Sequence, residues 1–289
     1  MTIHNKDTES PAQGTYRPGI WQILLPVFAF ILLFSLMQFA CLLMYRHLKA
    51  SGPLFLRPFL AGRPGLCMTA MILFSMVAAL FPVLREGRVR LDAFRKRVRA
   101  DAADRGMKEM IPIWTGLTAC ACALCIFGNA QIQSIGLNSE SVSTMQPVYR
   151  ELPFLFILLI FAVLTPFVEE YVFRGILYTG LRSRFTPLLS MLLAAAMFGL
   201  YHEELIQGTY AFCMGLLFCI SLEVTGDLKA PWLLHSISNG LPLVISYLGL
   251  WETFLKREWR IGTFACFLIA AGLSGAALIR KNASRNDAI

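Results

Sequence analysis

The chain has 289 residues, of which 56% are hydrophobic and 15% are charged, and its formal net charge is +8. Soluble domains contain about 25% charged and roughly 45–50% apolar residues, so this composition excludes an ordinary soluble domain and indicates a polytopic membrane protein. Much of the positive charge lies between apolar runs, where Lys and Arg set topology and meet anionic lipid, so it does not indicate nucleic-acid binding.

The hydropathy pattern predicts an all-α fold, a polytopic bundle of about eight transmembrane helices. A polar tail, residues 1–19, precedes an apolar run that is too long for a signal-peptide core, so we expect the first helix to stay as an anchor. We divide the remainder into N-terminal helices (20–149), a central core (150–250), and a last helix with a basic tail (251–289). The predicted spans are 20–45, 65–84, 111–127, 152–181, 187–202, 209–224, 231–250 and 261–279.

The segment 85–110 is the most basic part of the chain and contains nine Lys and Arg residues, whereas 128–149 contains none. This asymmetry predicts a multi-pass protein of the cell membrane with both termini in the cytoplasm. We favour a solvated loop for 85–110. Because Leu91, Phe94 and Val98 recur at helical spacing, the alternative is an amphipathic helix lying on the membrane.

All eight cysteines lie in apolar runs, which predicts reduced thiols that pack between helices. Cys120, Cys122 and Cys125 have a spacing that resembles a metal site. One membrane helix cannot wrap three thiolates around one ion without ligands from elsewhere, so we do not predict a metal site there.

Glu169, Glu170 and Arg174 lie at the end of an apolar run that begins near residue 152. Charges at membrane depth cost roughly 2.5–3.5 kcal/mol each, so this cluster requires an explanation. Glu170 and Arg174 are an i, i+4 pair in the favoured order, which predicts an ion pair. Glu169 lies about 100° around the helix without a partner on its own strip, so we expect a desolvated carboxylate suited to general-base work. A structural ion-pair cluster that joins helices is the alternative.

Three further polar residues lie on two later helices. His202 ends the run Phe198–His202, where a lone histidine is usually an interfacial residue. His235 and Asn239 share one helix face at i, i+4, which indicates that they face the bundle interior, although hydrogen bonding between helices would explain them equally well.

Together these residues predict a hydrolytic site. Glu169 can activate water with the help of His202, while His235 and Asn239 can donate hydrogen bonds to the oxyanion of a tetrahedral intermediate. A Zn²⁺ ion held by His202, His235 and a glutamate, here Glu169, is the alternative, and the glutamate mechanism needs no cofactor. The sequence contains neither H-E-x-x-H nor G-x-S-x-G, which argues against an ordinary zincin and against serine chemistry.

The three motifs resemble those of the CAAX prenyl endopeptidase type II and bacteriocin-processing (CPBP, or Abi) family of intramembrane proteases. That family carries E-E-x-x-x-R, F-x-x-x-H and H-x-x-x-N on separate membrane helices. Here the motifs are Glu169 to Arg174, Phe198 to His202, and His235 to Asn239. The resemblance covers about residues 150–250 and implies hydrolysis of a peptide bond in a membrane-associated or lipidated peptide or protein. In the family the first glutamate and the second-motif histidine act on water, and the third motif stabilises the oxyanion.

Two other functions are compatible with the same residues. A non-catalytic scaffold or bacteriocin-immunity protein could keep the polar cluster for helix packing. A proton-coupled transporter could use Glu169, Glu170 and Arg174 as a relay, but the two halves of the chain show no internal repeat and no matching pair of broken helices.

Overall fold

The computed structural model describes residues 18–102, 107–134, 147–202 and 204–270, and these residues contain helices and no β-strand. The prediction of an all-α fold is confirmed. Residues 257–270 are also helical. The labelled elements are α1 (Ile20–Ser51), α2 (Leu56–Gly62), α3 (Pro64–Leu80), η1 (Phe81–Val83), α4 (Leu84–Ala102), α5 (Met107–Ser134), α7 (Phe154–Ile157), η2 (Leu158–Leu164), α8 (Thr165–Glu170), η3 (Tyr171–Tyr178), α9 (Thr179–Arg182), α10 (Pro187–Tyr201), α11 (Leu205–Thr225), α12 (Lys229–Tyr247) and α13 (Trp251–Phe254).

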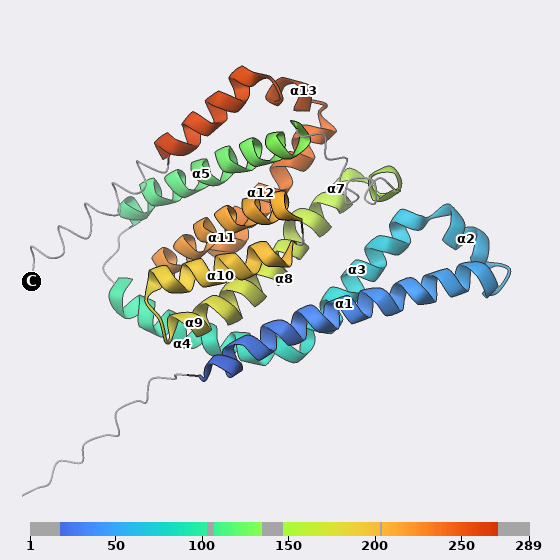
Figure 1. Ribbon diagram of the computed structural model, residues 1–289, viewed down its shortest axis with the longest axis horizontal. Helices are drawn as coiled ribbons and strands as arrows, with labels where there is room; N and C mark the ends of the chain where they lie inside the picture. The colour runs from blue at the N-terminus through green and yellow to red at the C-terminus, as the bar shows by residue number, and fades with distance from the viewer. Residues whose placement is uncertain (1–17, 103–106, 135–146, 203, 271–289) are drawn as a thin grey trace, which may run out of the picture.

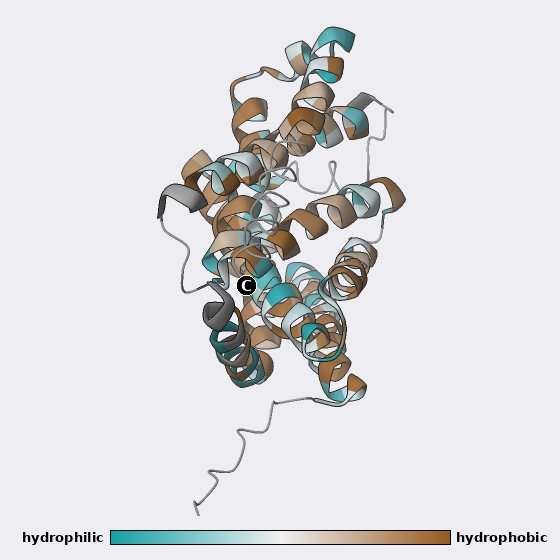
Figure 2. Ribbon diagram, turned by 90° about the vertical axis from the view of Figure 1, so that its left-hand side faces the viewer, coloured by the Kyte–Doolittle hydropathy of each residue, from teal (hydrophilic) through white to brown (hydrophobic). Residues whose placement is uncertain are grey.

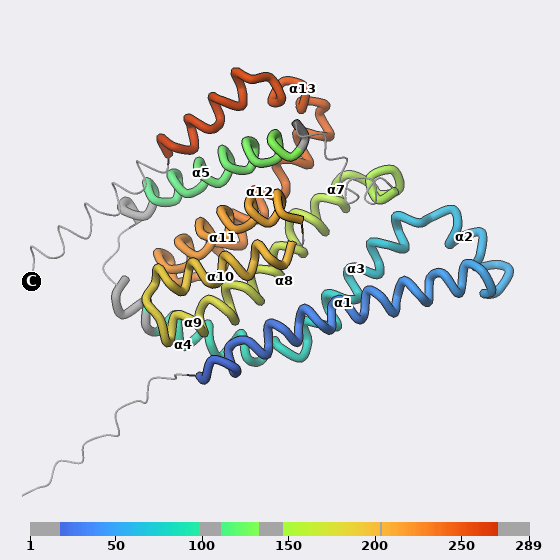
Figure 3. The backbone as a smooth tube through the Cα atoms, viewed as in Figure 1, coloured from blue at the N-terminus to red at the C-terminus, as the bar shows by residue number. Residues whose placement is uncertain are grey.

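The helices form a layered bundle (Figures 1 and 3). At one side α1 and α3 run together as a long hairpin, closed by α2. The helices α8 to α12 form the centre, and α5 packs against α11 and α12 on the other side. Long apolar stretches, interrupted by hydrophilic positions, are visible along most of the helices in Figure 2.

Five helical stretches of the described residues are long and apolar enough to cross a membrane, as expected of a multi-pass membrane protein. In lipid a helix is favoured because it satisfies its backbone hydrogen bonds internally. The count of eight spans stays a prediction. The helix α10 is apolar but shorter, α12 in the predicted span 231–250 is not among the five stretches, and the last predicted helix is described only as far as residue 270. The five stretches are Ile20–Ser51, Pro64–Lys96, Ile111–Ile132, Phe154–Arg182 and Leu205–Thr225.

Two predicted loops are helical in the structure. In the predicted loop 46–64, α1 continues to Ser51 and α2 covers Leu56–Gly62. The preference for a solvated loop at 85–110 is wrong for the part that α4 covers, up to Ala102. Leu91, Phe94 and Val98 are each less than 10% exposed because they pack into the protein core, not onto a membrane surface. The side chains of Arg97, Arg99, Arg105 and Lys108 and the tail 1–17 lie outside the described residues.

A buried arginine fastens α4 to the helix that carries the glutamates. Arg90 is 2% exposed and forms an ion pair with Glu86. Its Nη1 donates to the carbonyl of Ile176 in η3 at 3.0 Å, and its Nη2 donates to the carbonyl of Gln22 in α1. A guanidinium has five donors, so one side chain ties three helical segments together.

Local sequence signals fix the ends of α10 and α11. Pro187 occupies the first turn of α10, and the hydroxyl of Thr186 accepts a hydrogen bond from the Leu189 N–H. Gly226 ends α11 in the left-handed conformation, with φ of 66°. The two helices approach closely at Gly199, where an added Cβ would lie 2.7 Å from the carbonyl oxygen of Gly208.

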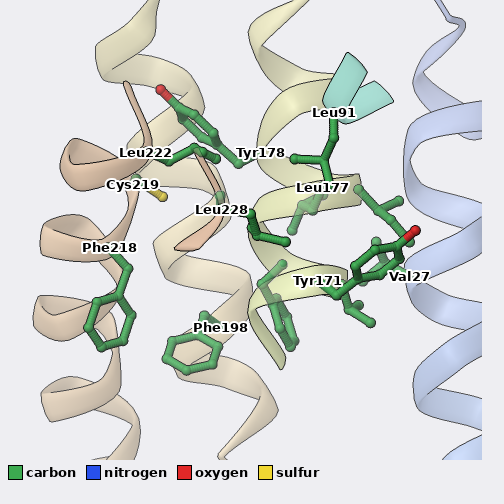
Figure 4. Close-up of a cluster of buried hydrophobic side chains, with 14 of the residues drawn as sticks. Val27, Leu91, Tyr171, Leu177, Tyr178, Phe198, Phe218, Cys219, Leu222 and Leu228 are labelled. Atoms are coloured by element: carbon green, nitrogen blue, oxygen red, sulfur yellow. The ribbon is translucent and has the colours of Figure 1, made fainter. Parts of the chain in front are cut away.

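The hydrophobic core lies where α1, α4, η3, α10 and α11 meet (Figure 4). Phe198 from α10 and Phe218 from α11 lie in this core, and each is 1% exposed. Because Glu170 and Arg174 lie on the helix that borders the same core, the charged cluster is surrounded by apolar side chains.

Candidate active site

The glutamates and the arginine lie in a helical stretch of mixed register. Residues 154–182 are continuously helical, but η2 and η3 are π-helical and flank the α-helical turn α8. π-helical turns are rare and occur frequently at functional sites. Glu169 and Glu170 are the last residues of α8, and Arg174 lies in η3. Their exposed fractions are 8% for Glu169 and 0% for Glu170 and Arg174.

The predicted ion pair between Glu170 and Arg174 is confirmed. Arg174 Nη1 donates to Glu170 Oε1 at 2.9 Å, and Arg174 Nη2 donates to the carbonyl of Gly215 in α11 at 3.3 Å. The guanidinium carbon lies 4.3 Å from the ring centroid of Phe198 and 4.9 Å from that of Phe218. Two aromatic faces therefore enclose a cation that is also paired with a carboxylate, and this arrangement compensates for its burial.

His235 of α12 reaches both glutamates. Its Nδ1 lies 2.8 Å from Glu170 Oε1, and its Nε2 lies 3.5 Å from Glu169 Oε2. A carboxylate paired with arginine is ionised and can only accept, so Nδ1 of His235 is the donor and neutral His235 has its lone pair on Nε2. Glu170 thus orients the imidazole, and Nε2 points towards Glu169.

The two carboxylates have different surroundings, as the helical spacing predicts. Glu170 Oε1 accepts hydrogen bonds from both Arg174 and His235. The contact of Glu169 comes from His235 on α12, so its partner lies on another helix and not on the same strip of its own helix. That contact, at 3.5 Å, is longer than a normal hydrogen bond, so Glu169 is the less constrained carboxylate.

His202 caps the end of α10 and is half-buried. Its Nδ1 lies 2.8 Å from the carbonyl oxygen of Phe198, which can only accept, so the lone pair of neutral His202 is on Nε2. The ring of Phe198 lies 4.7 Å from the His202 ring and 5.7 Å from the His235 ring. Both imidazoles thus flank one phenyl ring, but no hydrogen bond among the described residues joins His202 to Glu169 or His235.

Asn239 lies one turn beyond His235 on α12 and is half-buried. Its Nδ2 donates to the carbonyl of Phe161 in η2 at 3.2 Å. One of the two N–H groups of this amide is therefore engaged, and the second is available to another acceptor. The structure thus brings Glu169, Glu170, Arg174 and His235 into direct contact and places Asn239 beside them.

Sequence reasoning missed the aromatic residues around the cluster. Phe218 stacks on His235, with ring centroids 4.7 Å apart and planes 22° from parallel, and its ring also contacts Arg174. Trp232 precedes His235 by one helical turn and contacts the stretch that carries the glutamates. In the sequence, only Phe198 could have been assigned to the site, because it belongs to the F-x-x-x-H motif. The other aromatic residues lie in apolar runs, where hydropathy does not distinguish them from ordinary core residues.

A metal-bound site is the alternative that the sequence leaves open. Within the described residues, no group of three or more His, Cys, Asp and Glu side chains is placed to hold a metal ion. The Zn²⁺ site predicted as an alternative, with Glu169, His202 and His235, is therefore not assembled in this arrangement. The eight cysteines are all free, as predicted.

Comparison with known proteins finds one similarity, which covers the part of the chain that carries the three motifs. Residues 151–241 match the family model described as type II CAAX prenyl endopeptidase Rce1-like. No curated protein and no solved structure matches the chain.

Proposed function

We propose that this protein is an intramembrane endopeptidase, because residues 151–241 match the model of the Rce1-like type II CAAX prenyl endopeptidases. Its substrate is a membrane-associated or lipidated peptide or protein, and the reaction is hydrolysis of a peptide bond. Membrane lipids surround the enzyme, and nucleic acid has no part in its function.

The difference between the two carboxylates carries the proposal. Glu170 is fully buried and shares one oxygen between Arg174 and His235, so it serves orientation. Glu169 has no arginine partner among the described residues and lies 3.5 Å from the lone-pair nitrogen of His235. A buried carboxylate without a tight partner is costly in a membrane protein, which supports a chemical role for it.

Glu169 acts as the general base. It removes a proton from a water molecule while the water oxygen attacks the carbonyl carbon of the substrate peptide bond. The resulting tetrahedral intermediate carries its negative charge on the former carbonyl oxygen. When the C–N bond breaks, the proton passes from Glu169 to the leaving nitrogen, so that water has been divided between the two products. His202 assists through its Nε2, which its bond to the Phe198 carbonyl leaves available.

His235 and Asn239 stabilise the oxyanion. Because His235 Nδ1 donates to Glu170, donation from Nε2 requires the imidazolium form; His235 takes this proton from solvent before the attack and keeps it until the products leave. The amide of Asn239 keeps one N–H free of the Phe161 carbonyl. Donors held in fixed positions before the reaction contribute most to such stabilisation, typically about 3–4 kcal/mol each.

We propose that these steps need no cofactor. A zinc mechanism would use Glu169, His202 and His235 as ligands and a bound water as the nucleophile. Because these three side chains are not grouped to hold an ion, every step above uses the chain's own residues.

The decisive experiment compares the parental protein with Glu169→Gln in membranes of the same cells. New protein N-termini are enriched and identified by mass spectrometry, and cleavage of the identified segment is repeated with purified protein in liposomes. We expect cleavage by the parental protein and a loss of about 10²–10⁴-fold in Glu169→Gln. Equal cleavage by both would refute the glutamate mechanism.

The same comparison separates the enzyme from a scaffold. If neither protein yields new N-termini while Glu169→Gln loses thermal stability, the polar cluster serves helix packing, as the scaffold hypothesis requires. A prenylated C-terminal peptide serves as a defined probe, because the matched family model is described as a type II CAAX prenyl endopeptidase.

A further inference from the structure

One face of α12 presents three side-chain donors to the stretch that ends in the glutamates. Trp232, His235 and Asn239 lie at positions i, i+3 and i+7, which share a helix face. His235 contacts Glu169 and Glu170, as described above. The two outer members of the row bind backbone carbonyls of η2, and α12 packs along η2 and α8 (Figure 1).

These carbonyls belong to the π-helical turn before the glutamates. Trp232 Nε1 donates to the carbonyl of Val163 at 3.0 Å, and Asn239 Nδ2 donates to that of Phe161 at 3.2 Å. The N–H of Thr165, the first residue of α8, bonds to the carbonyl of Ile160, five residues earlier. The hydrogen-bond register therefore changes between η2 and α8, and donors from α12 hold the carbonyls of the altered turn.

Trp232 also contacts the glutamate-bearing turn itself. Its ring packs edge-to-face against the ring of Phe167, with centroids 5.6 Å apart. Phe167 is two residues before Glu169, and Trp232 is three residues before His235. The indole thus contacts the glutamate-bearing stretch at two residues that both precede Glu169, and joins the two helices close to the point where Glu169 and His235 meet.

The contact between these side chains is too weak to set their own spacing. The 3.5 Å between Glu169 Oε2 and His235 Nε2 exceeds the normal range of about 2.7–3.2 Å for a hydrogen bond. The bond from Trp232 to Val163 is within that range. We propose that Trp232 is a positioning residue that fixes the register of α12 against α8, and hence the spacing of Glu169 and His235. This inference rests on the proposed function.

The test isolates the indole N–H from the shape of the side chain. Trp232 is replaced through a suppressor tRNA by 3-benzothienylalanine, which has sulfur in place of the N–H, and by 5-fluorotryptophan, which keeps the N–H. We expect kcat of peptide cleavage to fall about 10- to 100-fold with benzothienylalanine, because small displacements of reacting groups cost that much. KM should change less than threefold, and 5-fluorotryptophan should retain parental kcat. Parental kcat with benzothienylalanine would overturn the proposal.

Two further measurements keep the outcome clear. Trp21 is 67% exposed, so benzothienylalanine at that position is the matched control and should leave kcat unchanged. If the parental protein cleaves nothing, the proposed function fails, and NMR of ¹⁵N-labelled indoles in micelles still tests the bond. The N–H of Trp232 should exchange with D₂O at least tenfold more slowly than that of Trp21. Equal exchange rates would overturn the positioning role whether or not cleavage is seen.

Discussion

The substitution Arg174→Met tests how the charged cluster is held inside the bundle. Arg174 is 0% exposed and contacts Glu170, the carbonyl of Gly215 and the rings of Phe198 and Phe218. Methionine keeps much of the apolar packing volume but removes the positive charge and all the donors. Glu170 would then be a fully buried carboxylate whose remaining hydrogen-bond partner is His235.

The expected loss of stability follows from these contacts. Removing one partner of a buried ion pair typically costs about 3–5 kcal/mol. The two ring contacts add roughly 0.5–2 kcal/mol each, part of which methionine restores by packing. At about 2–4 °C for each kcal/mol, Arg174→Met should lower the melting temperature by on the order of 10 °C.

The assay is thermal unfolding in a fixed detergent, followed by a fluorophore that reacts with exposed cysteines. The double variant Glu170→Gln/Arg174→Met removes both charges and should recover most of the loss, since a neutral replacement leaves no buried charge without a partner. The double variant should be inactive, because the neutral glutamine at position 170 no longer provides the carboxylate that orients His235. Arg85→Met is the control at an exposed position and should change the melting temperature little. A loss below 1 kcal/mol (about 2–4 °C) in Arg174→Met would refute the assignment of a buried ion pair.

Three further predictions concern the reaction. Glu169→Gln should lower kcat by about 10²–10⁴-fold without lowering the melting temperature, because its contact with His235 is long and the neutral amide avoids burial of a charge; a decrease as large as that of Arg174→Met would indicate a structural role. Phe218→Leu should lower kcat about tenfold by releasing the stacked imidazole of His235, whereas Phe212→Leu on the same helix should not; equal effects would contradict positioning by stacking. Chelation should leave cleavage intact, and elemental analysis of active protein should find less than one zinc for every ten chains; loss of activity that zinc restores would refute the glutamate mechanism.

The sequence predicts the helices correctly where a long apolar run is enough to identify a membrane-spanning segment. The stretch 154–182 was predicted within a few residues, because a long apolar run must be helical in lipid. The α4 region could not be placed from hydropathy, since its charges outnumber its apolar residues. Leu91, Phe94 and Val98 indicated an amphipathic helix, but only tertiary packing decides whether such a stripe faces lipid or protein.

The candidate site was predictable to the extent that its residues share a helix. The pairing of Glu170 with Arg174 follows from i, i+4 spacing, and the structure confirms it. The contact of His235 with both glutamates joins positions more than 60 residues apart, and spacing along one helix contains no information about it. The π-helical turns were also beyond prediction, because the carbonyls of η2 bind donors such as Trp232 that come from another helix.

The contacts that build the candidate site also pack the helices together. Glu169 is the exception, because it contributes little to this packing. Glu170 and Arg174 are buried, but their charges are paired with each other and have further contacts with His235 and α11, so together they join three helices. Glu169 is desolvated to almost the same degree and has a single long contact among the described residues. Packing does not require a carboxylate there, since a neutral side chain of similar size would avoid the desolvation. Chemistry explains such a residue better than packing does, and this is the physical reason to propose Glu169 as the base.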